Sequence, residues 1–180
     1  LKECWNYLTE SFTEAPIEHL VKTEKDLPAY RYIYENIRYV PDYAYALKRK
    51  NQVGEMGVVL CYLPKSPFMQ LVALDAGIIA VTYMAMEAPD ELAHTIQVMA
   101  FALSRACQIA VDSPAEVLMI PENLSAEMVG PRFFEQYMRE YQTEWSRKII
   151  AAGKYSCIHM DGSLRGLLSE ECSVGLSFIE

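Results

Sequence analysis

Short apolar runs alternate with longer stretches of helical periodicity along the chain. The run "GVVLCYLP", residues 57–64, is β-branched and bounded by Gly and Pro, which predicts a strand buried on both faces. Similar short runs predict three further strands, at residues 116–120, 154–160 and 174–180. Strands are therefore expected at four places, all in the second two-thirds of the chain.

Apolar residues at three- and four-residue steps predict helices between these strands. The longest pattern starts at Pro89 and continues to about Val111, with one apolar stripe. Ser66 and Pro67 suit the N-cap and first position of another helix. Pro131 suits the first position of a further helix, and Gly153 suits the position just after its end. Helices are expected at residues 66–75, 78–86, 89–111, 131–152 and 163–169.

The first 56 residues predict a lead-in that is mainly helical. Thr23 is expected to cap a short helix, because Asp26 follows three positions later. Two further helices are expected at residues 30–39 and 42–51, the second with Pro41 at its start. No strand is expected in this part of the chain.

Strands that alternate with helices favour an α/β fold with parallel strands. We therefore predict one domain over residues 1–180, in which residues 57–180 form four β/α units. A complete barrel of eight such units takes about 250 residues. The order of elements therefore fits either an open parallel sheet or part of a barrel.

Composition and charge exclude several classes of protein. The net charge of −8 gives no support to binding of nucleic acid or of an anionic membrane. No apolar run reaches the roughly 20 residues of a transmembrane helix. The five cysteines form no C-x-x-C pair, which favours a reducing, cytoplasmic location. The first residues include neither Met nor an apolar leader, so the natural start is expected to lie outside this sequence.

The stretch "YSCIHMDG", residues 155–162, carries the strongest candidate chemistry. In a strand, Cys157, His159 and Asp161 lie two residues apart and share one face. Imidazole and carboxylate groups are both good zinc ligands. The alternative is structural, because a histidine at a strand end is often simply hydrogen-bonded and Asp161-Gly162 is a good turn.

Three segments together resemble the uroporphyrinogen decarboxylase superfamily. They are "VVLCYLPKSPFMQL", "SPAEVLMIPENLSAEMVGPRFFEQYM" and "AAGKYSCIHMDGSLRGLL", and the resemblance covers most of the chain after about residue 16. This superfamily includes corrinoid-dependent methyltransferases. The resemblance implies a TIM-type (β/α)8 barrel, of which this chain would be an incomplete, internal fragment.

The resemblance also implies a site at the carboxyl ends of the strands. The thiol-activating methyltransferases of the superfamily carry His-x-Cys where this sequence has His159-x-Asp161, and they hold zinc there. A zinc ion held by His159 and Asp161, with Glu122 as third ligand or general base, is therefore implied. A carboxylate is a harder, less electron-rich metal ligand than the thiolate that it replaces. The resemblance gives no role to Cys157.

Three further residues are candidates for substrate contacts. Asn123 can orient a substrate carboxylate or amide, and the resemblance places Glu122 and Asn123 at the pocket. Tyr62 shares a strand face with Leu60 and would line the pocket mouth. Arg165 can meet an anionic substrate. The structural alternative is that Glu122 and Asn123 satisfy loop backbone groups.

Three functions follow from the resemblance. The first is a corrinoid-linked methyltransferase that moves a methyl group between methylcobalamin and a small acceptor at a metal-assisted site. The second is a decarboxylase of a tetrapyrrole substrate, which needs no metal. The third is a non-catalytic relative. The implied partners are a small-molecule substrate, a corrinoid protein and, through unpaired strand edges, a second copy of the chain.

Overall fold

A computed structural model describes all residues from 1 to 180, and the chain divides into two compact units. The first unit comprises Leu1–Ile37 and Pro67–Met99, and the second comprises Arg38–Ser66 and Ala100–Glu180. Each unit therefore combines two separate stretches of sequence. The units do not divide at residue 56, where the sequence analysis separated the helical lead-in from the β/α units.

The first unit opens with a β-hairpin that the sequence analysis did not predict. Its strands pair antiparallel. Thr23 precedes the first helical turn as its N-cap, as predicted, and the carboxylate of Asp26 accepts a hydrogen bond from the backbone N–H of Thr23 at 3.1 Å. The elements of this unit are β1 (Cys4–Leu8), β2 (Thr13–Glu18), η1 (Glu24–Asp26), α1 (Leu27–Asn36), α3 (Pro67–Gln70), η3 (Leu71–Asp75) and α4 (Ile78–Glu87).

A buried tyrosine joins two helices of the first unit. The Tyr30 hydroxyl in α1 donates to Asp75 Oδ2 at 2.5 Å, and Gln70 Nε2 donates to the same oxygen at 2.8 Å. Burial raises the pKa of Tyr30 far above its ordinary value. Asp75 ends η3, which is a π-helix, so the single helix expected at residues 66–75 is divided into α3 and η3.

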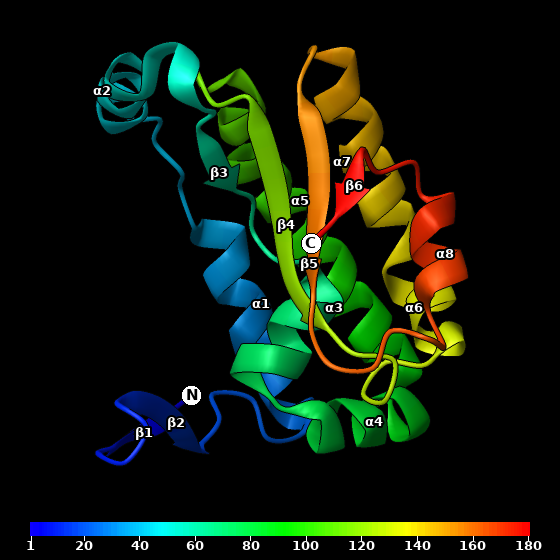
Figure 1. Ribbon diagram of the computed structural model, residues 1–180. Helices are drawn as coiled ribbons and strands as arrows, with labels where there is room; N and C mark the ends of the chain where they lie inside the picture. The colour runs from blue at the N-terminus through cyan, green and yellow to red at the C-terminus, as the bar shows by residue number, and fades with distance from the viewer. The chain divides into compact units, whose positions relative to one another are not determined.

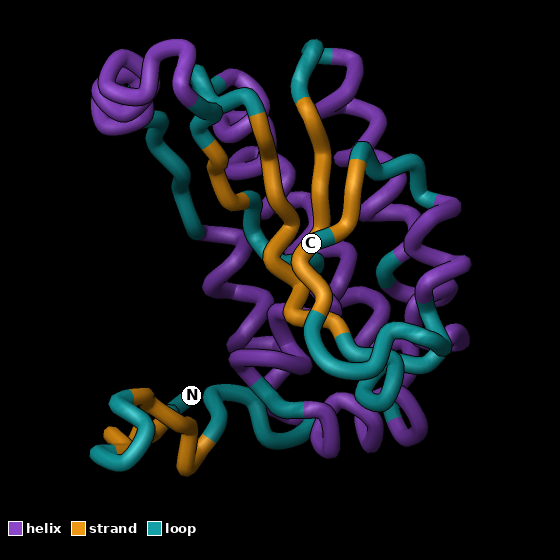
Figure 2. The backbone as a smooth tube through the Cα atoms, viewed as in Figure 1, coloured by secondary structure: helices purple, strands orange, loops and turns teal.

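The second unit contains a four-stranded parallel sheet in the order β3-β4-β5-β6, shown side by side in Figures 1 and 2. The strands are β3 (Leu60–Tyr62), β4 (Val117–Leu124), β5 (Tyr155–Met160) and β6 (Phe178–Ile179). Their pairing is parallel throughout. The prediction of parallel strands alternating with helices is confirmed, although β3 and β6 are shorter than expected.

Helices connect these strands. The 3-10 turn η2 and α2 precede β3, and α5 begins in the first unit and ends in the second. The single helix expected from Pro131 is divided at Met138 into α6 and α7. The helix expected at residues 163–169 begins only at Leu168. The bounds are α2 (Ala44–Val53), η2 (Gly54–Met56), α5 (Pro89–Asp112), α6 (Pro131–Tyr137), α7 (Arg139–Ala151) and α8 (Leu168–Ser173).

Helices cover one face of the sheet, and alternate residues of β4 pack against them. Leu118, Ile120 and Leu124 are fully buried on this face. Ser156 of β5 points the same way, because its hydroxyl lies 3.0 Å from the hydroxyl of Ser146 in α7. A strand side chain faces its helix layer at every second position, so this parity determines which residues reach the core.

The opposite face of the sheet is only partly buried. Val117, Met119 and Cys157 form a small buried cluster there. Beside it, Leu60 is 39% exposed and Tyr62 is 64% exposed. The expectation that this first strand is buried on both faces is therefore wrong, because β3 is an edge strand with only one covered face.

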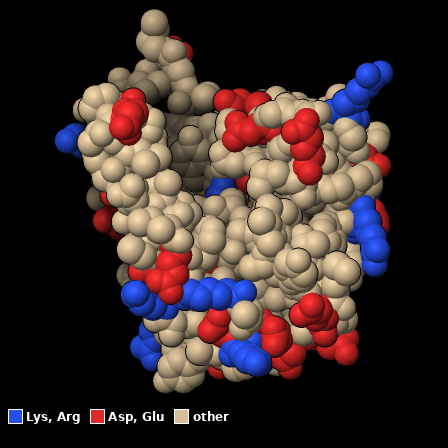
Figure 3. Space-filling view, turned by 90° about the horizontal axis from the view of Figure 1, so that it is seen from below, with Lys and Arg blue, Asp and Glu red and all other residues tan.

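The surface carries no extended basic area on the face shown in Figure 3. Lys and Arg side chains there are interspersed with Asp and Glu side chains. This distribution agrees with the net charge of −8. None of the helices combines the length and the apolar character that a membrane span requires.

We expect Leu118→Ala to lower the free energy of unfolding by about 2–5 kcal/mol, because it opens a cavity between β4 and the helices. Leu168→Ala is the matched control, since Leu168 is 45% exposed in α8. The control is expected to change stability by less than about 0.5 kcal/mol. Urea denaturation measures both, and equal losses would contradict the packing described here.

Candidate active site

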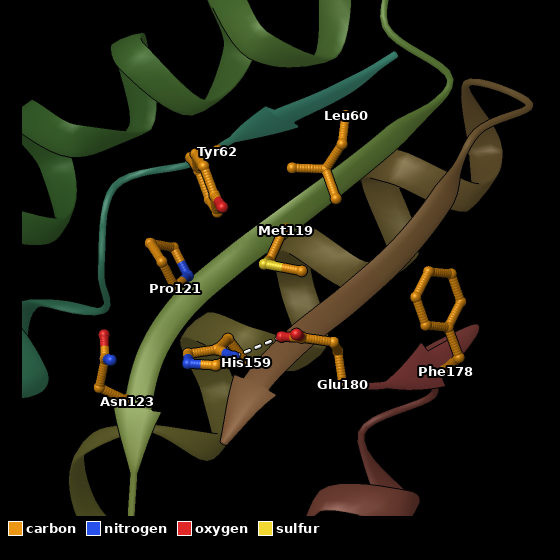
Figure 4. A pocket seen from close by; sticks show the side chains of 8 residues that line it. All are labelled: Leu60, Tyr62, Met119, Pro121, Asn123, His159, Phe178 and Glu180. Carbon is orange, nitrogen blue, oxygen red and sulfur yellow. Dashed lines mark hydrogen bonds and ion pairs between the residues drawn. The ribbon is translucent and has the colours of Figure 1, made fainter. Parts of the chain in front are cut away.

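A pocket of about 540 Å³ lies on the open face of the sheet in the second unit. Its lining comes from β3, β4, β5 and the end of the chain at β6 (Figure 4). The eight lining residues are Leu60, Tyr62, Met119, Pro121, Asn123, His159, Phe178 and Glu180. Pockets of this volume suit small organic ligands.

The pocket combines an apolar part with polar groups placed at strand ends. Leu60, Met119 and Phe178 give the apolar part. His159 lies near the carboxyl end of β5, and Asn123 lies near that of β4. Active sites of parallel β/α folds are assembled at this edge, because the carboxyl ends of all the strands meet there.

A continuous chain of polar contacts crosses this edge of the sheet. Lys65 Nζ donates to Asn123 Oδ1 at 2.5 Å and also to the carbonyl of Pro121. Asn123 Nδ2 donates in turn to Asp161 Oδ2 at 2.7 Å. The other Asp161 oxygen lies 3.3 Å from His159 Nε2. The remaining ring nitrogen, Nδ1, pairs with the carboxylate of Glu180.

His159 is the centre of this chain, because each ring nitrogen faces a carboxylate. Figure 4 shows the imidazole and the Glu180 side chain pointing toward each other. A ring that donates through Nδ1 to Glu180 keeps a fixed orientation, as in acid–base sites where a carboxylate orients a histidine. Nε2 then faces Asp161 and can exchange a proton there.

Local backbone geometry aims Asn123 at the pocket. Asn123 has a positive φ of 53°, in the left-handed region that asparagine tolerates better than most residues. The pairing of β4 with β5 shifts its register between Ile120 and Leu124, around this residue. This irregularity places Asn123 between Lys65 and Asp161. Burial lowers the pKa of Lys65, and the negative charges of Glu122 and Asp161 partly offset this effect.

Four of the predicted site residues come together. Tyr62, Asn123 and His159 line the pocket, and Asp161 joins through its contacts with Asn123 and His159. Arg165 does not: it is exposed in the turn before α8 and outside the pocket lining.

Glu122 is placed on the other face of β4, so its expected role as a ligand beside His159 requires correction. It is fully buried and accepts hydrogen bonds from the backbone N–H of Ser66 at 3.2 Å and from its hydroxyl at 3.0 Å. Gln142 Nε2 donates to it at 3.3 Å. Burial raises the pKa of Glu122. The reason is parity, because Glu122 has the same parity as the helix-facing Leu118 and Ile120.

The residues of this chain do not by themselves fit a zinc centre with three protein ligands. His159 Nε2 and Asp161 are adjacent and offer two ligands. Glu122 lies on the opposite face, and Glu180 occupies the other nitrogen of the same imidazole. No group of three His, Cys, Asp or Glu side chains is arranged to hold a metal ion, whereas a catalytic zinc takes about three protein ligands.

Two members of the polar chain, Lys65 and Glu180, were not among the predicted site residues. The backbone N–H of Glu180 donates to Ile158 at 2.9 Å, and its carbonyl accepts from Met160 at 3.0 Å. These bonds fix Glu180 beside His159. The sequence does offer a signal for Glu180. It directly follows an apolar run that predicts a strand, so it is expected at the carboxyl end of that strand, and His159 lies near the carboxyl end of β5 in the same way.

We expect Glu180→Ala to remove the contact at His159 Nδ1 and to speed exchange of its ring proton with water. Nitrogen-15 NMR of the imidazoles measures this, because the chain has only three histidines. His19 and His94 serve as internal references. Glu170→Ala, at a partly exposed glutamate in α8 that lies outside the pocket lining, is the control. An unchanged His159 signal in Glu180→Ala would refute the contact.

Comparisons with known proteins identify the fold and the family of the chain. No curated protein is significantly similar to the chain in sequence. A solved structure, a methyltransferase from Methanosarcina mazei, is similar in fold with a TM-score of 0.61 at 14% sequence identity. The match covers 98% of this chain and 52% of that chain, so this chain spans about half the length of the solved one.

The similar fold identifies the four parallel strands as part of a TIM-type barrel, as the sequence predicted. The sequence profile described as uroporphyrinogen decarboxylase (URO-D) matches residues 8–180, nearly the whole chain. The chain therefore belongs to the uroporphyrinogen decarboxylase family.

Proposed function

We propose that the protein is a corrinoid-linked methyltransferase, which moves a methyl group between methylcobalamin and a small acceptor bound in the pocket. The observation that carries this proposal is the position of His159, held between Asp161 and Glu180 beside an apolar pocket. A methyl acceptor such as a thiol must lose a proton to become a nucleophile, and an oriented imidazole is a suitable base.

The volume of the pocket supports binding of the small acceptor inside it and of the corrinoid outside it. About 540 Å³ accommodates a small acceptor but not a whole corrinoid. Tyr62 and Phe178 of the lining are 64% and 44% exposed, so the pocket is open on one side. A corrinoid protein that presents its methyl group from that side would bring both substrates together.

His159 performs the proton step in this proposal. The acceptor lies against Met119 and Phe178, and its proton passes to Nε2 of His159 while Nδ1 stays paired with Glu180. Asp161 stabilises the positive charge that then develops on the ring. The deprotonated acceptor then attacks the methyl group of methylcobalamin. A bond forms from the acceptor to the methyl carbon, the carbon–cobalt bond breaks, and its electron pair stays on the departing corrinoid as cob(I)alamin. The side chains of this chain offer two of the three ligands of a catalytic zinc, so the proton step is assigned to His159 itself.

Decarboxylation of a tetrapyrrole is the second candidate, and Lys65 is the observation that favours it. Its ammonium group lies at the pocket edge, bonded to Asn123 and to the Pro121 carbonyl. A substrate carboxylate could replace Asn123 as its partner. This activity would depend on Lys65 more than on His159.

We expect purified full-length protein to demethylate methylcobalamin when a small thiol is supplied, and we expect His159→Ala to slow this reaction by about 100-fold to 10,000-fold. The change in the visible spectrum of the corrinoid measures the rate. His94→Ala is the control, because His94 lies in α5 outside the pocket.

Two results would contradict the proposal. One is the absence of any thiol-dependent demethylation. The other is equal activity of His159→Ala and the control variant. Carboxylate loss from uroporphyrinogen, reduced in Lys65→Met and kept in His159→Ala, would support the decarboxylase instead.

A further inference from the structure

A second polar cluster lies behind the sheet, away from the pocket. It joins Glu122 of β4, Gln142 of α7 and Glu171 of α8, and all three side chains are fully buried. Gln142 Nε2 donates to Glu122 Oε1 at 3.3 Å. The same amide side chain also lowers the pKa of Glu171.

The cluster has more hydrogen-bond acceptors than donors. Glu122 is satisfied by Ser66 and Gln142. In contrast, Gln142 Oε1 and both carboxylate oxygens of Glu171 are buried without a partner. Unpaired buried acceptors cost free energy, and two ionised carboxylates in one buried place cost more. A proton on Glu171 removes one charge and supplies a donor.

We propose that Glu122 and Glu171 hold one proton between them, with Gln142 as the bridge, and that loss of this proton loosens α8 from α7 and β4. The proton belongs mainly to Glu171, because Glu122 has three donors that stabilise its charge and Glu171 has none. The cluster is thus a proton-dependent latch, and its titration does not require the reaction proposed for the pocket.

The electrostatic surroundings agree with this assignment. Burial and then the negative charge of Glu122 raise the pKa of Glu171 to about 8, against weaker opposition from Gln142 and Arg139. The positive charge of Lys65 lowers the pKa of Glu122, against the larger effect of burial. Cys107 and Tyr141 also face Glu122, but burial raises the pKa of each, so neither is charged near neutrality.

Loosening of α8 reaches the pocket through a short connection. α8 ends at Ser173, and β6 begins at Phe178, directly before Glu180. Arg139 holds the end of α8 through a 2.5 Å bond to the Ser173 hydroxyl, so the helix shifts about this point. Glu180 in turn fixes His159. The latch therefore links a proton behind the sheet to the histidine in front of it.

The sign of the pH dependence follows from the raised pKa. A glutamate with a higher pKa in the folded protein stabilises the fold fully below the unfolded value of 4.5, and this stabilisation is lost as pH rises to about 8. One proton changes the unfolding equilibrium constant by at most about tenfold per pH unit in this window. Above pH 8 the dependence levels off.

The test compares wild type with Glu171→Gln, which mimics the protonated acid, from pH 5 to pH 9 in urea. The wild-type unfolding constant is expected to rise with pH, whereas Glu171→Gln is expected to lose most of this rise. Glu170→Gln, at the partly exposed neighbouring glutamate, is the matched control and should keep this rise. Protection factors of the α8 amides, which correct for the faster intrinsic exchange at high pH, should fall at pH 9 in wild type and in Glu170→Gln but not in Glu171→Gln.

Infrared spectroscopy of the wild type adds a measurement that needs no variant. A C=O stretch from a protonated buried carboxyl is expected at pH 6 and should be absent at pH 10. Absence of this band at pH 6, or equal pH profiles for wild type and Glu171→Gln, would overturn the proposal. So would stabilisation by Na⁺ or K⁺ at pH 9 that depends on Glu171, because a cation would then occupy the cluster.

Discussion

The alternation of side chains along β4 is the constraint on which the second unit depends. Leu118, Ile120 and Leu124 are directed to the helices and form the core. Met119 and Asn123 are directed to the pocket. Because the strand has only two faces, adjacent residues acquire unrelated roles: Asn123 joins the polar chain at the pocket, and Glu122 joins the buried acidic cluster. A shift of one residue would exchange the two sets.

The same rule explains which parts of the site could be predicted from sequence. His159 is in β5 and Asp161 directly follows that strand, two residues later, so strand periodicity predicted that they lie together, and the structure agrees. Glu122 and Asn123 were grouped by adjacency, and parity separates them. The contact of Glu180 with His159 depends on the pairing of β5 with β6. The apolar runs predict that both strands form but do not say that they are neighbours in the sheet.

Tertiary context also accounts for the differences in the fold. Local periodicity located the helices and the parallel strands, because burial on one face leaves a strong pattern in the sequence. The strands of the hairpin, Cys4–Leu8 and Thr13–Glu18, are mostly exposed and lack such a pattern. Burial of Glu171 could not be foreseen either, since a glutamate in a short helix is usually at the surface.

The polar chain from Lys65 to Glu180 has a consequence for selectivity. The inward groups of Asn123, Asp161 and His159 already have partners, so an entering ligand must exchange hydrogen bonds rather than simply add them. A ligand that returns as many bonds as it removes meets little resistance. An apolar molecule of the same shape leaves a polar side chain without a hydrogen-bond partner, which costs about 1–3 kcal/mol of binding free energy. The pocket thus favours molecules that replace the hydrogen bonds that its side chains make with one another.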